Sequence, residues 1–168
     1  MDNFSKYIND FTSDIKSENH LLIINFFIYF SRFEYAMKRS SYGKLKWNLQ
    51  YWDADWHKLS QELLSNKIFS NFTRNNVSEI VLSPPKRMDS QNNFETNSSS
   101  RNIIDSVKIV RNNLFHGGKF HWWPNEIESE RNIKLINESL AILKLIIEDQ
   151  DLRFQNYDSL RAHFNQYI

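Results

Sequence analysis

The sequence predicts an all-α fold, an antiparallel helical bundle formed by residues 1–168 as a single domain, and three observations support this prediction. Apolar residues recur every three or four positions over long stretches, which is the period of an amphipathic α-helix. Glycine and proline, which interrupt helices, occur only three times each. Aromatic residues make up 15% of the chain, which is enough for a bulky core in a domain of this length.

The periodicity and the polar residues that begin helices predict the elements in order. We expect Asp53 or Asp55 to cap a helix that ends near Ser65, one of Ser98–Ser100 to cap the helix at 103, and Asp158 to cap a short C-terminal helix. The full set of expected helices covers residues 3–15, 18–40, about 56–65, 75–82, 103–115, 125–148 and the C-terminal stretch.

The helix over residues 18–40 carries an unexpected carboxylate. One apolar seam of this helix contains Phe30, and Glu34 occupies the next position of that seam. A buried carboxylate needs a partner. Two interpretations are open: Glu34 holds Arg111 from the helix at 103–115, or it pairs with Lys38 one turn away on a solvated face.

Two segments between the helices are irregular. Residues 83–100 begin with Ser-Pro-Pro and are polar, so we expect a long, mobile surface loop before the helix at 103. Residues 44–56 interleave lysines with Trp47, Tyr51, Trp52 and Trp56, a pattern that can bind single-stranded nucleic acid but that more often packs a loop onto the core.

Composition excludes several classes of function. The chain has no cysteine, and its five histidines show no metal-ligand spacing, so we expect no metal and no cofactor. A net charge of +1 argues against a dedicated duplex-binding protein. The apolar run 21–30 is too short to cross a bilayer, which takes about 20 residues. No targeting peptide is visible, and we expect a cytoplasmic protein.

The most informative stretch is Val110–Lys119, where an apolar helix runs into Gly117-Gly118. Arg111 lies in the last turns of this helix, and His116 lies where the glycines end it. Arginine presents a fixed fork of donors to phosphate oxygens, and histidine exchanges protons near neutral pH. These two residue types suit the cleavage of a phosphodiester without a metal.

The spacing of the pair restricts how it can work. In a continuous helix Arg111 and His116 lie about 140° apart, so one helix face cannot present both. Either the helix unwinds at Gly117 or a second copy of the chain contributes. Asn112 lies one turn before His116 and is suited to orient its ring. The alternative is an ordinary helix end, with Arg111 and His116 in structural roles.

The stretch Arg111–His116 resembles the Arg-x4–6-His signature of the HEPN superfamily, and the block Ser31–Arg39 is similar to the second-helix block of bacterial HEPN proteins. Ala54–Leu59 also resembles a helix start between the two blocks, so the resemblance covers about residues 25–147. It implies a HEPN-type bundle and a metal-independent endoribonuclease. By the same resemblance, Glu34 is the acidic residue that accompanies the Arg and His.

The function implied is cleavage of RNA by attack of its own 2′-hydroxyl, giving 2′,3′-cyclic phosphate and 5′-hydroxyl ends. The expected catalytic residues are Arg111, Asn112, His116 and Glu34, and the expected substrate-binding cations are Lys119, Arg32 and Lys38. The resemblance also implies a homodimer with the active site at its interface. It further suggests a toxin or antiviral effector restrained by a partner, often a nucleotidyltransferase-type antitoxin.

Two other functions compete with the nuclease. The first is a non-catalytic helical module that dimerises or recruits a partner, in which Arg111 and His116 are structural. The second is a regulatory domain that uses the same arginine and histidine to hold the phosphate of a nucleotide. His121, close to the motif, is a further histidine for which a structural role is the simpler interpretation.

Overall fold

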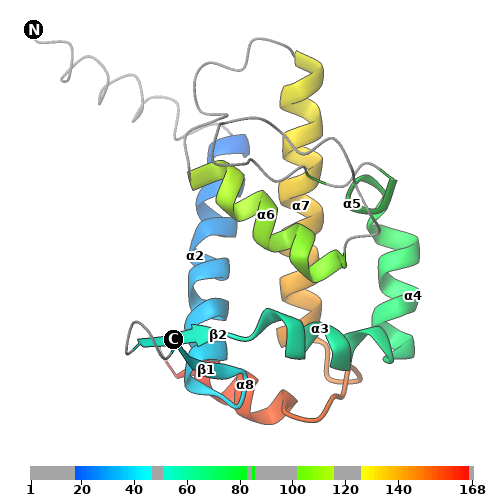
Figure 1. The fold of residues 1–168 in the computed structure, drawn as a ribbon. Coiled ribbons are helices and arrows are strands. Elements are labelled where there is room, and N and C mark those ends of the chain that lie inside the picture. The colour runs from blue at the N-terminus through cyan, green and yellow to red at the C-terminus, as the bar shows by residue number, and fades with distance from the viewer. Residues whose placement is uncertain (1–17, 47–50, 83–84, 86–101, 116–125, 167–168) are drawn as a thin grey trace, which may run out of the picture.

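The computed structural model describes residues 18–46, 51–82, 85, 102–115 and 126–166, and these residues form a mostly helical protein with one small sheet (Figure 1). The expected helix 3–15 and nearly all of the expected loop 83–100 lie outside the described residues. The elements are α2 Glu18–Arg39, β1 Gly43–Lys46, β2 Tyr51–Ala54, α3 Trp56–Leu64, α4 Lys67–Asn76, α5 Ser78–Leu82, α6 Ile103–Phe115, α7 Glu126–Glu148 and α8 Tyr157–Asn165.

The two longest helices, α2 and α7, lie side by side and form the centre of the fold (Figure 1). They run in the same direction, so this pair departs from the antiparallel arrangement that we expected. The helix α6 crosses the pair obliquely, α3 crosses near its lower end, and α4 and α5 flank α7. The helix α8 packs against both α2 and α7.

The core is filled by large apolar side chains from several helices. In its second half α7 is buried around most of its circumference, because α2, α4, α5, α6 and α8 all pack on it. The expected stripes of α2, α6 and α7 supply most of the core, although Phe27 is 43% exposed. The large side chains that are almost fully buried include Phe26, Phe33, Met37, Leu59, Ile104, Ile142, Leu143 and Ile146.

Helix starts are fixed by side-chain caps. Asp55 accepts a hydrogen bond from the backbone N–H of Lys58, which confirms one of the two caps expected for α3. The helix α6 begins where we expected, but its cap is Asn102, whose side chain accepts from the N–H of Ile104, rather than one of Ser98–Ser100. The expected cap Asp158 lies inside α8 and pairs with Arg153 at 3.0 Å.

The stretch that follows α3 differs from the prediction. We expected one helix over 75–82, whereas α4 occupies 67–76 and the short α5 follows after Val77. The side chain of Asn66 caps α4 by accepting from two backbone N–H groups. The carboxylate of Glu138 on α7 accepts from the N–H groups of Glu79 and Ile80, both at 2.8 Å, and so caps α5 from a distant part of the chain. This partner cannot be recognised from the local sequence.

A two-stranded hairpin joins α2 to α3. The strands β1 and β2 pair antiparallel, with Gly43 opposite Ala54 and Leu45 opposite Trp52. Gly43 is required because a Cβ there would collide with the carbonyl oxygen of Lys38 and lie 3.0 Å from the Cε3 atom of Trp52. The hairpin therefore sits directly on the last turn of α2.

Candidate functional site

The helix α6 presents the predicted motif at its C-terminal end. It is helical from Ile103 to Phe115, as the sequence predicted, so Arg111 and Asn112 lie in the last described turns of this helix. His116 and Lys119, together with His121, lie outside the described residues. Their predicted roles stay predictions.

An aromatic stack positions Arg111. Its guanidinium carbon lies over the ring of Phe30, 5.5 Å from the ring centre. Phe30 in turn stacks on Trp56, with 5.3 Å between ring centres and 19° between the planes. The stack therefore joins α6, α2 and α3, and it fixes the direction in which the arginine leaves its helix. We call these three residues the Arg111 stack.

Asn112 contacts Arg111 directly. Its side-chain oxygen Oδ1 accepts a hydrogen bond of 3.1 Å from Nη1 of Arg111. Both side chains are half-buried, so each is partly shielded from solvent and still reachable from it. The sequence assigned Asn112 to the orientation of His116 or of the phosphate, and the structure adds a contact with the arginine itself.

Glu34 and Lys38 form the ion pair that was one of the two interpretations of the sequence. The Lys38 Nζ atom lies 2.9 Å from Oε1 of Glu34, and both side chains are partly exposed. Glu34 is one helical turn beyond Phe30, on the same side of α2. The structure thus places Glu34 and Lys38 on the side of α2 that receives Arg111, whereas the hold of Glu34 on Arg111 stays a prediction.

Arg32 lies elsewhere. It follows Phe30 by two residues, which on a helix is a rotation of about 200°. Its Nη2 atom donates a hydrogen bond of 2.7 Å to the backbone carbonyl of Phe164, and its guanidinium lies 4.8 Å from the centre of the Phe164 ring. The structure therefore attaches Arg32 to the end of α8 and does not bring it to Arg111.

A groove of about 490 Å³ opens between α2, α7 and α8, beside Arg32. Within it the hydroxyl of Tyr29 donates a hydrogen bond of 3.1 Å to Oε1 of Glu148. Burial, followed by the nearby charge of Glu148, raises the pKa of Tyr29 well above its ordinary value. A phenol is already protonated at neutral pH, and the raised pKa keeps Tyr29 a hydrogen-bond donor in more alkaline solution as well. Lys144 also lines the groove.

Sequence reasoning did not identify Phe30 or Trp56 as parts of the site. Phe30 was assigned to an apolar seam, and it is indeed buried, with 2% of its surface exposed. Arg111 lies over the Phe30 ring because of the way α6 crosses α2, and no local sequence pattern predicts that crossing. In contrast, the cap Asn102 was available from the sequence, because asparagine directly before an apolar helix start is a strong cap.

Within the described residues no group of three or more acidic or histidine side chains is arranged to hold a metal ion. In the same part of the chain, no helix combines the length and the apolar character needed to span a membrane. A scan against models of protein families finds no match, and comparisons with curated proteins and with solved structures find none either.

Proposed function

We propose that this chain is a metal-independent endoribonuclease with a HEPN-type helical fold. The observation that carries the proposal is the geometry of Arg111, which leaves the last turns of α6 half-buried and is held by the Phe30 ring and by Asn112. A cation fixed in this way is preorganised to meet a phosphate, because its side chain has already lost most of its freedom. The helix is formed through Phe115, the residue that precedes the proton-exchanging histidine of the motif.

In the proposed reaction the 2′-oxygen of RNA forms a bond to the adjacent phosphorus, and the bond from phosphorus to the 5′-oxygen breaks. His116 takes the proton of the 2′-hydroxyl, and a second His116 gives a proton to the departing 5′-oxygen. Arg111 stabilises the charge that develops on the non-bridging oxygens. The products are a 2′,3′-cyclic phosphate and a 5′-hydroxyl, and DNA is not cut because it lacks the nucleophile.

The proposal includes a homodimer, since each chain has one motif histidine and the reaction uses an acid and a base. Asn112 would hold the guanidinium of Arg111 in position through their hydrogen bond. Glu34, which forms an ion pair with Lys38 on α2, would attract the same guanidinium. Lys119 and Lys38 would contact the RNA backbone. Arg32 was expected to do the same, but its contacts with Phe164 favour a role in docking α8.

The biological role that fits this chemistry is a toxin or an antiviral effector in the cytoplasm. An unrestrained ribonuclease harms its own cell, so the proposal includes a partner that holds it in check. Through the HEPN resemblance, that partner is a nucleotidyltransferase-type antitoxin.

One observation favours a second function, a non-catalytic helical module. The guanidinium of Arg111 makes contacts inside the chain, with Asn112 and Phe30, and such contacts also suit a purely structural arginine. A module of this kind would dimerise or recruit a partner without cutting RNA. A nucleotide-binding domain is the third possibility, and titration of labelled nucleotides against the same variants separates it from the other two.

The deciding experiment incubates the purified protein with RNA and excess chelator. We expect cleavage by the wild type, and losses of about 100- to 1000-fold for Arg111→Ala and for His116→Ala. Arg111→Lys keeps the charge but loses the fork, so we expect it to stay impaired. Arg74→Ala, which removes an exposed arginine from the last turn of α4, is the matched control and should cut normally.

Three results would contradict the proposal. Cleavage that persists in both motif variants would show that another group does the chemistry or that the preparation is contaminated. Cleavage that stops with chelator would replace the mechanism by a metal-dependent one. Intact RNA with the wild type would favour the non-catalytic module, and sedimentation of the same sample then reports whether the dimer exists.

A further inference from the structure

The hairpin between α2 and α3 carries a tryptophan side chain that is not buried in the core. Trp52 on β2 is 57% exposed, whereas Trp56, four residues later, is 4% exposed. Leu45 lies directly opposite Trp52 on β1 and is 44% exposed. Opposite residues of an antiparallel pair project from the same face, so Trp52 and Leu45 together form an open apolar surface.

One edge of the Trp52 ring rests on the hairpin backbone. The Cε3 atom of Trp52 lies close to Gly43, where any larger residue would displace it. The base of the hairpin is anchored because Ala54 is 2% exposed and the N–H of Asp55 donates a hydrogen bond of 2.7 Å to the carbonyl of Tyr42. A ring that is fixed before binding loses little entropy when a ligand stacks on it.

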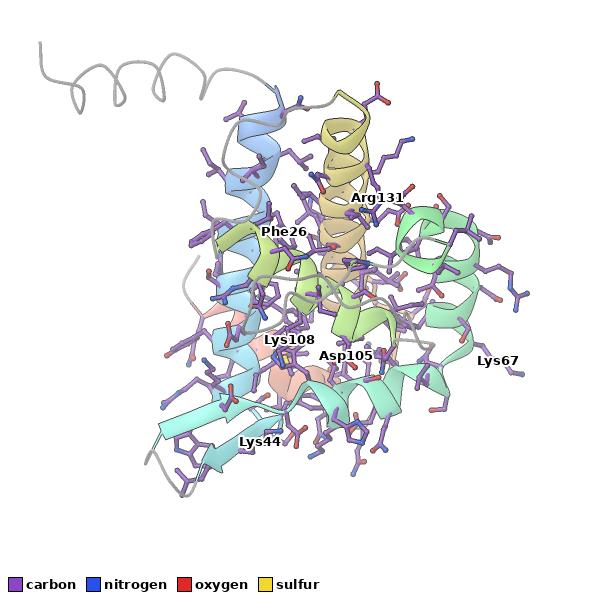
Figure 2. The ribbon with its side chains drawn as sticks, turned by 45° about the horizontal axis from the view of Figure 1, so that its top comes forward. Phe26, Lys44, Lys67, Asp105, Lys108 and Arg131 are labelled. Atoms are coloured by element: carbon purple, nitrogen blue, oxygen red, sulfur yellow. The ribbon has the colours of Figure 1, made fainter. Side chains whose placement is uncertain are left out.

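The surroundings of the hairpin are basic, although the chain as a whole is nearly neutral. Residues 38–58 contain five of the 21 Lys and Arg but only two of the 20 Asp and Glu, which gives this segment +3 and leaves −2 for the rest of the chain. Arg39 is exposed, and within the described residues it forms no ion pair. Lys44 is adjacent to Leu45 in β1 and so projects from the opposite face of the hairpin, where its Nζ atom lies 3.4 Å from Oδ1 of Asp55. Figure 2 shows Lys44 on the hairpin, at the end of α2 away from Phe26.

From these observations we propose that Trp52 is a stacking platform for a base of single-stranded RNA, with Arg39 holding an adjoining phosphate. This inference rests on the proposed ribonuclease function and deepens it by naming a contact for the substrate. Aromatic rings beside cations bind single strands of any sequence, because every base has a π-face and every nucleotide a phosphate.

The position of the platform suits a substrate that reaches Arg111. The hairpin rests on Lys38, eight residues beyond Phe30 in α2, and eight residues of helix span about 12 Å. RNA stacked on Trp52 would therefore follow α2 for only a few nucleotides before it meets the Arg111 stack.

The experiment measures binding separately from cleavage. A fluorescently labelled oligonucleotide of about a dozen nucleotides, with every 2′-hydroxyl methylated so that it cannot be cut, is titrated by anisotropy against the full chain. We expect Trp52→Ala to bind about 5- to 100-fold more weakly, and Trp52→Phe to bind almost as well as the wild type. Trp52→Leu keeps an apolar side chain without the ring and should bind as weakly as Trp52→Ala. Leu64→Ala, at an exposed apolar position of α3, is the control and should leave binding unchanged.

A second arm tests the cation. Arg39→Ala should weaken binding similarly for all sequences and should reduce the dependence of affinity on salt by about one phosphate contact. Thermal unfolding of each variant should match the wild type, since Trp52 and Arg39 are exposed. A normal salt dependence in Arg39→Ala would overturn its assignment to phosphate.

The outcomes separate the platform from the nuclease. Binding that depends on Trp52 in a protein that cuts no RNA supports the platform and contradicts the nuclease. Cleavage that needs Arg111 and His116 but ignores Trp52→Ala, together with unchanged binding, overturns the platform alone. The platform is also overturned if the wild type binds no oligonucleotide, or if Trp52→Leu binds like the wild type. Loss of a dimer in sedimentation by Trp52→Ala, with RNA binding unchanged, would assign the surface to a protein contact instead.

Discussion

The contact between Arg111 and Phe30 can be measured by a double-mutant cycle. Phe30→Leu keeps an apolar side chain in the core but removes the ring that contacts both Trp56 and the guanidinium. Arg111→Met keeps most of the length of the side chain and removes the charge. The two single variants and the double variant, compared with the wild type, isolate the energy of the pair.

The expected magnitude follows from the contacts. A cation over an aromatic ring contributes about 0.5–1 kcal/mol when exposed and about 2 kcal/mol when desolvated, so the half-buried pair should contribute about 1 kcal/mol. Phe30→Leu also loses the stacking on Trp56, worth about 1 kcal/mol, and part of its volume. We therefore expect Phe30→Leu to lower the free energy of unfolding by about 2–3 kcal/mol. Arg111→Met should lower it by about 1–2 kcal/mol, because the hydrogen bond to Asn112 is lost as well.

The assay is equilibrium unfolding in urea for all four proteins under identical buffer conditions. The double variant should be less destabilised than the sum of the singles by about 1 kcal/mol. Phe69, which is 2% exposed on α4, provides a matched control: Phe69→Leu combined with Arg111→Met should be additive. If the effects of Phe30→Leu and Arg111→Met on the free energy of unfolding also add to within about 0.3 kcal/mol, the idea that Phe30 holds Arg111 is refuted.

Two further predictions concern stability. Glu138→Ala removes the carboxylate that caps α5, so we expect a loss of about 2 kcal/mol and a melting temperature lower by about 4–8 °C, with the exposed neighbour Asn137→Ala unchanged as the control in calorimetry. Burial raises the pKa of Asp55, but the N–H of Lys58 and the charge of Lys44 outweigh it and hold that pKa below its ordinary value. Asp55→Asn should therefore destabilise the protein at pH 7, and the difference from the wild type should diminish as the pH falls through the lowered folded-state pKa of Asp55. Denaturation curves that differ equally at pH 7 and pH 3 would contradict this account.

The helices that matter for the site were largely predictable. The start of α6 at Ile103 agrees with the prediction, because apolar periodicity is a local signal, and the helix runs through Phe115, the last described residue before the predicted stop. The C-terminal ends of α2 and α7 agree with the prediction within about one residue for the same reason, whereas their starts lie at the edge of the described residues. The helix α4 was missed, although Ile68, Phe69 and Phe72 lie at helical spacing, because most of its residues are polar; it is stabilised by the burial of Phe69 and Thr73.

The composition of the candidate site was only partly predictable. Arg111, Asn112, Glu34 and Lys38 were identified as chemically suited residues, but not the rings that place the arginine. Arg32 lies only two residues from Glu34, yet the structure turns it toward Phe164 and α8. The sequence shows which side chains a helix carries, whereas the residue that each side chain contacts on another helix depends on how the two helices cross.

By itself, therefore, the sequence determined that the chain is helical, where α2 and α7 end and α6 begins, and that an arginine lies in the last described turns of α6. These properties follow from hydrogen bonds and apolar spacing within a few residues of chain. The tertiary structure alone decided that α2 and α7 run in the same direction, that Phe30 receives Arg111, and that Trp52 is open to solvent while Trp56 is buried. Those outcomes depend on contacts between residues far apart in the chain, which no local pattern encodes.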